Sequence, residues 1–178
     1  MILNGMTTLL ILWKKAYARM ELLRNISAIT NSLEEKKHIY VLNIRSILEQ
    51  SSVVWHNSLT QDNADDLERV QKCAVRIILG NDFVNYEEAL IKADLDTLKS
   101  RREVLSRNFA KKCLKNTKTK NMFPVRDKEH NMNIRNTEHF EVKFANTERL
   151  KNSAIPSMQR LLNSDYNINK QRKMRKPG

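Results

Sequence analysis

Apolar side chains recur every three or four positions through most of the first 115 residues, which is the spacing of amphipathic helices. Five helices are predicted on this basis, over residues 7–29, 33–55, about 61–79, 86–93 and about 97–115. The second is apolar over more than half of its circumference, so it is expected at the centre of a bundle. The side chains expected to face the interior are Leu10, Trp13, Tyr17, Met20, Leu23 and Ile26 in the first helix, Leu67, Val70, Cys73, Ala74, Ile77 and Ile78 in the third, and Leu98, Leu105, Phe109 and Cys113 in the fifth.

Short polar residues mark where these helices begin, because a side-chain oxygen just before the first turn can accept a hydrogen bond from an unpaired amide. A Glu three residues later adds the reciprocal half of a capping box. Gly80 is expected to close the third helix in a left-handed conformation. The expected caps are Ser32 with Glu35, Thr60 or Asp62, Asn85 with Glu88, and Asp96.

The composition favours an all-α fold, since glycine and proline number three each and aromatic residues make up only 6% of the chain. A small bundle of about five helices is predicted over residues 14–115, where the periodic pattern ends. Residues 116–178 are rich in Asn, Thr and charge, which predicts a basic and mostly flexible tail. Within that tail, apolar residues around Pro156 predict one short helix near 154–163.

Residues 1–13 form an apolar lead-in whose character differs from the rest of the chain. Its apolar run from Leu9 to Trp13 is too short to cross a bilayer. Basic residues follow this run at Lys14 and Lys15, whereas a secretion signal carries them in front. We therefore expect neither a membrane partner nor secretion, and an intracellular location in the cytoplasm or the nucleus.

A formal charge of +12 and a pI near 9.9 attract polyanions, of which nucleic acid is the first candidate. An acidic membrane surface or an acidic protein would satisfy the same field, and well-solvated helix faces are an equal alternative. The charge is +4 over residues 1–115 and +8 over residues 116–178. The cations expected to contact phosphates are Lys14, Lys15 and Arg19 on the first helix, and Arg101, Arg102, Lys111 and Lys112 on the fifth.

The pattern of chemically active side chains gives no support to catalysis, to a metal site or to a cofactor. The one tempting carboxylate pair, Asp65 and Asp66, is expected in the first turn of the third helix, where neighbouring side chains diverge by about 100° and acids complement the helix dipole. Neither Cys73 nor Cys113 has a neighbour at zinc-ligand spacing, so both are expected to be reduced, buried and inert. The chain is therefore predicted to bind rather than to catalyse.

An ordered set of short motifs resembles one family. The second predicted helix ends in Trp55-His56, and the third carries Leu67-Glu68-Arg69-Val70-Gln71-Lys72. Other similar segments are Lys15-Ala16-Tyr17-Ala18-Arg19-Met20, Tyr86-Glu87-Glu88-Ala89-Leu90, Leu98 with Arg101-Arg102, and Asn146-Thr147-Glu148-Arg149-Leu150-Lys151 before Ile155-Pro156. Together, from about Lys14 to Asn163, they resemble the C-terminal region that follows the palm in reverse transcriptases of jockey-like non-LTR retrotransposons.

This resemblance implies a thumb-like and connecting helical region of an RNA-directed DNA polymerase, which helps to hold template and primer. The implied partners are RNA or an RNA–DNA hybrid, gripped through phosphates, and the palm of the parent polymerase. Since the palm carboxylates are not among these residues, we expect a non-catalytic fragment or remnant of a mobile element. The alternative is a helical structural or protein-interaction module with no nucleic-acid role.

Overall fold

A computed structural model describes residues 5–126, 139–142 and 144–174, with side-chain exposure for residues 10–126, 139–142 and 144–169. In these ranges the backbone forms helices and loops and contains no strand, apart from one isolated antiparallel bridge between Val125 and Phe140. The predicted all-α fold is therefore confirmed.

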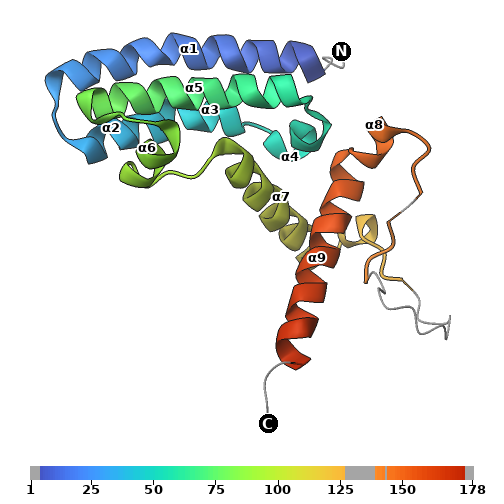
Figure 1. Ribbon diagram of the computed structural model, residues 1–178. Helices are drawn as coiled ribbons and strands as arrows, with labels where there is room; N and C mark the ends of the chain where they lie inside the picture. Colours follow the sequence, from blue (N-terminus) through green and yellow to red (C-terminus); the bar gives the residue numbers. More distant parts are fainter. Residues whose placement is uncertain (1–4, 127–138, 143, 175–178) are drawn as a thin grey trace. The chain divides into compact units, whose positions relative to one another are not determined.

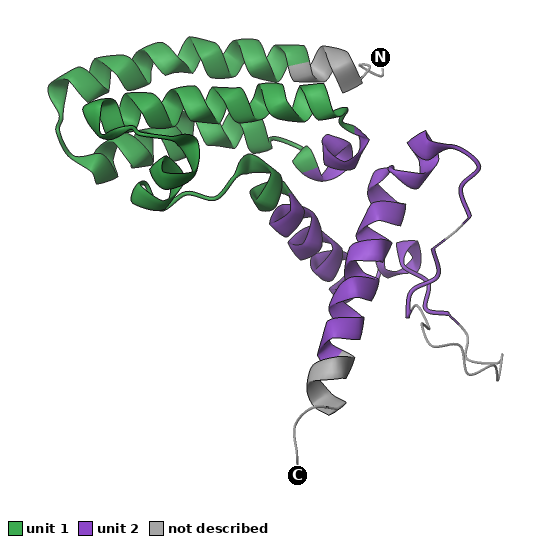
Figure 2. Ribbon diagram, in the orientation of Figure 1, with its two compact units in different colours: residues 1–52, 59–102 green, residues 53–58, 103–178 purple. Residues whose placement is uncertain are grey.

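The chain forms two compact units, coloured green and purple in Figure 2. Unit 1 comprises residues 1–52 and 59–102, and unit 2 comprises residues 53–58 and 103–178. Unit 1 contains α1 (Gly5–Ile29), α2 (Leu33–Tyr40), the π-helical turn η1 (Val41–Arg45), α3 (Ser46–Glu49), α5 (Gln61–Leu79), η3 (Gly80–Asp82) and α6 (Tyr86–Lys92). The α-helices are labelled in Figure 1. Unit 2 contains η2 (His56–Ser58), η4 (Lys120–Met122), α8 (Glu148–Lys151) and α9 (Ala154–Met174), while α4 (Ser52–Trp55) and α7 (Leu98–Lys115) contribute to both units.

In unit 1, α1 lies alongside α5, and the segment α2–η1–α3 packs against this pair (Figure 1). The buried face of α1 consists of Leu12, Ala16, Met20 and Leu23. The predicted face was right for Met20 and Leu23 but wrong at the start of the helix, where Leu10 is 54% exposed and Trp13 38%. The small Ala16 is fully buried, so α1 turns this side, rather than its aromatic side, toward its neighbours.

The π-helical turn η1 has a packing role in unit 1. Tyr40, Ile44 and Leu48 are all fully buried, and they follow one another at intervals of four residues. In a regular α-helix four residues turn through about 400°, so such positions drift around the helix by about 40° at each step. The wider turn over Val41–Arg45 offsets this drift and keeps the three side chains on the buried face.

The predicted continuation of the second helix to Trp55 is wrong. The helix ends at Glu49, and Ser51 has a φ of 54°, a conformation that costs a non-glycine residue about 1–2 kcal/mol. The apolar Val53 and Val54 consequently belong to unit 2.

The predicted helix caps are largely confirmed. The amides of Glu35, Asn63 and Glu88 donate to the side chains of Ser32, Thr60 and Asn85, at 3.4, 3.3 and 2.8 Å respectively. Gly80 closes α5 with a φ of 55°, the positive value that was expected. The cap of α7 differs from the prediction, because Thr97 accepts a hydrogen bond from the amide of Ser100 at 3.2 Å and Asp96 does not fill this position.

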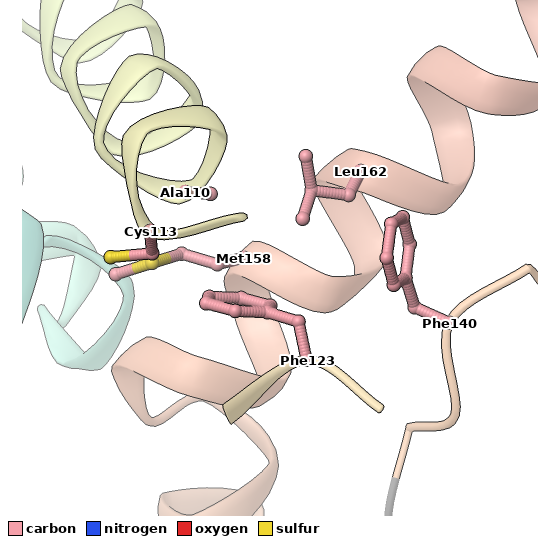
Figure 3. Close-up of a cluster of buried hydrophobic side chains, with 6 residues drawn as sticks. All are labelled: Ala110, Cys113, Phe123, Phe140, Met158 and Leu162. Atoms are coloured by element: carbon pink, nitrogen blue, oxygen red, sulfur yellow. The ribbon is translucent and has the colours of Figure 1, made fainter. Parts of the chain in front are cut away.

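Unit 2 has its own apolar core, shown in Figure 3: Ala110 and Cys113 come from α7, Phe123 and Phe140 from the connecting segments, and Met158 and Leu162 from α9. This core joins residues before position 116 to residues after it. The compact units therefore divide the chain after Arg102, not at the expected boundary at residue 116. The predicted short helix near 154–163 is also longer than expected, since α9 continues to Met174.

The buried side of α7 agrees with the predicted one at Leu98 and Cys113 but not between them. Its residues are Leu98, Arg102, Ser106, Ala110 and Cys113, whereas Phe109 is 47% exposed. Small side chains at 106 and 110 occupy the interior, so an assignment that follows the largest apolar residues fails in the middle of this helix.

Two amide side chains of α9 bind the backbone of the segments that cover it. Asn163 accepts from the amide of Phe140 at 2.7 Å and donates to the carbonyl of the same residue at 3.0 Å. Gln159 donates to the carbonyl of Met122 at 3.1 Å. Both side chains are at least 96% buried, so each hydrogen bond satisfies a polar group that water cannot reach.

Candidate nucleic-acid interface

The positive charge of the chain is concentrated in unit 2. Within the bounds of unit 1 the sequence has 14 basic and 13 acidic residues, a net charge of +1. Within the bounds of unit 2 it has 18 basic and 7 acidic residues, a net charge of +11. Long-range attraction of a polyanion therefore originates almost wholly in unit 2.

Three of the predicted contacts, Lys14, Lys15 and Arg19, lie on α1 of unit 1 and are exposed. Trp13 and Tyr17 meet edge to face beside them, with ring centroids 4.8 Å apart. The lysines and Arg19 thus lie on an accessible surface, but in the unit whose net charge is nearly zero. Their contact with phosphate stays a prediction.

Arg101 and Arg102 do not form an open basic surface. Arg101 donates to both oxygens of Glu49, from Nε at 3.0 Å and from Nη2 at 3.3 Å. Arg45 Nε approaches the same carboxylate at 3.6 Å. Arg102 is completely buried, and burial lowers the pKa of its guanidinium while the carboxylates of Glu68 and Glu49 act in the opposite direction. Contrary to the prediction, Arg102 is therefore not available to a phosphate, and Arg101 is already neutralised.

Gln71, one of the motif residues, lies at the centre of a buried hydrogen-bond network in unit 1. Its side-chain oxygen accepts from the hydroxyl of Tyr40 at 2.5 Å. Its amide nitrogen donates to the hydroxyl oxygen of Tyr86 at 3.0 Å and to the carbonyl of Asp96 at 2.8 Å. Because Gln71 is fully buried, all of its hydrogen-bonding capacity is directed at other parts of unit 1.

The motif residue Glu68 extends this network to the start of α7. Its Oε1 accepts from the hydroxyl of Tyr86 at 2.5 Å and from the amide of Leu98 at 3.2 Å. Burial and this hydrogen bond to Glu68 both raise the pKa of Tyr86. Glu68 therefore binds one of the amides that open α7, where a carboxylate also complements the helix dipole.

Lys111 and Lys112, the remaining predicted contacts, differ in their surroundings within unit 2. Lys111 Nζ lies 2.8 Å from Oδ2 of Asp165 on α9, and Arg107 Nε lies 3.2 Å from Oδ1 of the same residue. Lys112 is exposed, and no ion pair joins it to another residue in the described ranges. Of the four cations predicted on α7, Lys111 and Lys112 are both exposed, and Lys112 is the one without an ion pair among the described residues.

Sequence reasoning missed the cations that follow Lys112 around the end of α7. This group, the α7 basic cluster, consists of Lys112, Lys115, Lys118 and Lys120, all exposed. The turn that carries it is held by Asn116, which accepts from the amide of Lys118 at 2.9 Å. The sequence did contain a signal for this cluster, because lysine recurs every two or three residues across the predicted boundary at residue 116. Cations at this end also complement the helix dipole, which is their structural role if no ligand binds.

Unit 2 also contains an apolar groove of about 730 Å³. Two of its lining side chains are largely open to solvent, Phe144 at 90% and Val54 at 69% exposure. The remaining lining residues include Met122, Pro124, Leu150, Ile155 and Pro156, with Arg149 and Gln159 among the polar ones.

The tempting carboxylate pair is engaged with neighbours on its own helix. Asp65 accepts from Gln61 at 2.8 Å and Asp66 from Arg69 at 2.6 Å, and the pair lies in the second turn of α5 rather than the first. In the described part of the chain, no three His, Cys, Asp or Glu side chains are grouped so as to hold a metal ion. Cys113 is buried as predicted, but Cys73 is exposed, because α5 turns Gln71 and Val75 inward instead.

Among the helices that the structure describes, none combines the length and the apolar character that a membrane span requires. Comparison with protein-family models, with curated proteins and with solved structures gives no match.

Proposed function

We propose that this protein binds nucleic acid through backbone phosphates, without sequence preference, and that unit 2 provides most of the contact surface. The observation that carries the proposal is the division of charge, +11 in unit 2 against +1 in unit 1. Lysine and arginine that neutralise phosphates release condensed counterions, so a surface of this kind gains affinity without reading base edges.

The position of the α7 basic cluster supports this proposal. Four exposed lysines gather where α7 ends and the chain turns through η4, and a buried Phe123 anchors the turn in the core of unit 2. A charged surface on an ordered turn loses less conformational entropy on binding than the same charges on a flexible chain.

The resemblance to jockey-like reverse transcriptases supports the same proposal by a separate route. On that basis the chain is a non-catalytic fragment or remnant of the region after the palm, acting in the cytoplasm or the nucleus. Its ligand is then RNA or an RNA–DNA hybrid, and the palm of the parent polymerase is a protein partner.

The test compares two triple variants of the full chain, each of which removes three positive charges. Lys112→Gln/Lys115→Gln/Lys118→Gln alters the α7 basic cluster, and Lys14→Gln/Lys15→Gln/Arg19→Gln alters the exposed face of α1. Fluorescence anisotropy with a labelled RNA–DNA hybrid gives Kd between about 50 and 200 mM salt. We expect the first variant to raise Kd about tenfold or more and to reduce the salt slope by about 2. The second should change Kd by less than about threefold.

Two outcomes would reject parts of the proposal. Equal losses in both variants would reject the assignment to unit 2. Absence of salt-dependent binding by the wild-type chain would reject the nucleic-acid function itself.

A second candidate function is protein interaction, which the apolar groove of unit 2 favours. An exposed apolar surface that includes Phe144 and Leu150 is typical of a binding site, and Arg149 lies in its lining. A peptide segment that offers an apolar side chain to the groove and a carboxylate to Arg149 matches this chemistry.

Anilinonaphthalene sulfonate, which combines apolar rings with an anionic group, serves as a probe for the groove. Saturable binding that is lost in Leu150→Asp and weakened in Arg149→Gln would support this second candidate. Non-saturable binding, or binding that neither substitution affects, would count against it.

A further inference from the structure

We propose that Arg107 and Lys111 form a phosphate-binding position on α7 and that the carboxylate of Asp165 occupies this position in the folded chain. Asp165 thereby takes the place of a backbone phosphate and lowers the affinity of unit 2 for nucleic acid. This inference rests on the proposed function, since it concerns the same surface and the same ligand.

The geometry of the three side chains is that of an anion held between two cations. Arg107 and Lys111 are one helical turn apart on α7, so they project from the same side of the helix. Each contacts a different oxygen of Asp165, with Nε to Oδ1 at 3.2 Å and Nζ to Oδ2 at 2.8 Å. A phosphodiester also presents two oxygens that share one negative charge, so it can replace the carboxylate between the same two cations.

The site is accessible, and its contacts are not ideal. The side chains of Lys111, Arg107 and Asp165 are 51%, 33% and 21% exposed, so a phosphate at the surface can reach them. Among the described residues, Nε of Arg107 is itself buried and has no aligned hydrogen-bond acceptor, even though Asp165 lies within ion-pair distance. Once the Asp165 carboxylate is displaced, a phosphate group, which has oxygens in more directions than a carboxylate, can take its place and meet Arg107 along its N–H direction.

The packing of α7 against α9 does not depend on Asp165. The apolar side chains of Ala110, Cys113, Met158 and Leu162 meet between the two helices, as Figure 3 shows. Partly exposed ion pairs contribute little to stability. Removal of the carboxylate is therefore expected to release two cations and to leave the unit folded.

The experiment measures Kd for a labelled RNA–DNA hybrid with Asp165→Asn, and with Glu141→Gln as a control. Glu141 is an exposed residue of the same unit, so both substitutions change the net charge equally. We expect Asp165→Asn to lower Kd about three- to tenfold and to steepen the salt dependence by one to two phosphate contacts, roughly 1–2 in slope. Glu141→Gln should change Kd by less than about twofold.

The adjacent residues Lys111 and Lys112 provide a second test of the inference, whose first part leaves Asp165 unchanged. In the wild-type background Lys112→Gln should weaken binding about three- to tenfold, but Lys111→Gln less than about twofold, because Lys111 is already neutralised. In the Asp165→Asn background, Lys111→Gln should weaken binding about as much as Lys112→Gln does.

Several outcomes overturn the inference while leaving the proposed function in place. One is salt-dependent binding in which Asp165→Asn and Glu141→Gln behave alike. Another is an equal loss of affinity for Lys111→Gln and Lys112→Gln in the wild-type background. This result would overturn the inference even if Asp165→Asn fails to fold. If no variant binds the hybrid in a salt-dependent manner, the proposed function fails first and this inference fails with it.

Discussion

Replacement of Gln71 by leucine should destabilise unit 1 although it inserts an apolar residue of similar size into the core. The hydroxyl of Tyr40 is fully buried and donates to Gln71, so the substitution leaves it without that acceptor, at a cost of about 1–3 kcal/mol. Loss of the bonds to Tyr86 and to the carbonyl of Asp96 adds about 0.5–1.5 kcal/mol each. The greater hydrophobicity of leucine returns about 1–2 kcal/mol, so the expected net loss is about 2–3 kcal/mol.

Urea unfolding, followed by circular dichroism and by hydrogen exchange of α5 peptides, measures this effect. With an m-value of about 1.5 kcal/mol/M, the unfolding midpoint of unit 1 should fall by about 1.3–2 M. Gln61→Leu is the matched control, because it makes the same change at an exposed position of the same helix and should stay within about 0.5 kcal/mol of wild type.

A double-mutant cycle separates the hydrogen bond from general damage to the core. Tyr40→Phe removes the orphaned hydroxyl, so Tyr40→Phe/Gln71→Leu should be more stable than the sum of the single losses implies, by about 1–2 kcal/mol. Additive losses, or a Gln71→Leu variant as stable as wild type, would refute the network as a source of stability.

Three further predictions test other parts of the structure. Burial raises the pKa of Tyr40 above its ordinary value of 10.0, so above pH 10 the folded state keeps a proton that the unfolded state loses. The free energy of unfolding should therefore fall above pH 10, with a slope approaching about 1.4 kcal/mol per pH unit. Alkaline unfolding of Tyr40→Phe should lack this part of the slope. Asn163→Ala should lower stability by about 2–4 kcal/mol, because it strands the buried amide and carbonyl of Phe140, and thermal unfolding monitored in unit 2 checks this. A thiol reagent should modify Cys73 rapidly in the native chain and Cys113 only after denaturation, and equal rates for the two would contradict their assigned exposures.

Features that depend on neighbouring residues were predictable from the sequence. The caps at Ser32, Thr60 and Asn85 involve a side chain and an amide three positions later, so the sequence contains both partners of each hydrogen bond. The positive φ at Gly80 follows from the same kind of local chemistry. Local chemistry of this kind is therefore sufficient to place the boundaries of most helices.

The choice of buried face could not be predicted in the same way. α1 and α7 each carry large apolar residues on more than one side, and the side that faces inward is set by partners far along the chain. Ala16 and Ala110 are fully buried, whereas Trp13 and Phe109 remain partly exposed. Close approach of two backbones favours small side chains, and this preference has no signature in the periodicity of large ones.

The candidate interface was predictable only as a charge and not as a set of residues. Arg101 is neutralised by Glu49, and Lys111 by Asp165, residues more than fifty positions away in each case. A basic run in a sequence indicates nothing about such partners, which tertiary packing supplies. Lys112 is the predicted cation of α7 that is exposed and has no ion pair among the described residues.

The residues of the buried network and those that carry the charge have different roles in this fold. Glu68, Gln71, Tyr86 and Arg102 are directed into unit 1, where they join α5, α6 and the start of α7. These side chains hold one another in place, so a substitution at any of them is expected to change the geometry of the network. Affinity for a polyanion depends instead on unit 2, whose net charge can change without disturbing that network. Stability and binding should consequently respond to separate sets of substitutions, with Gln71 as the sensitive position for the first and Lys112 for the second.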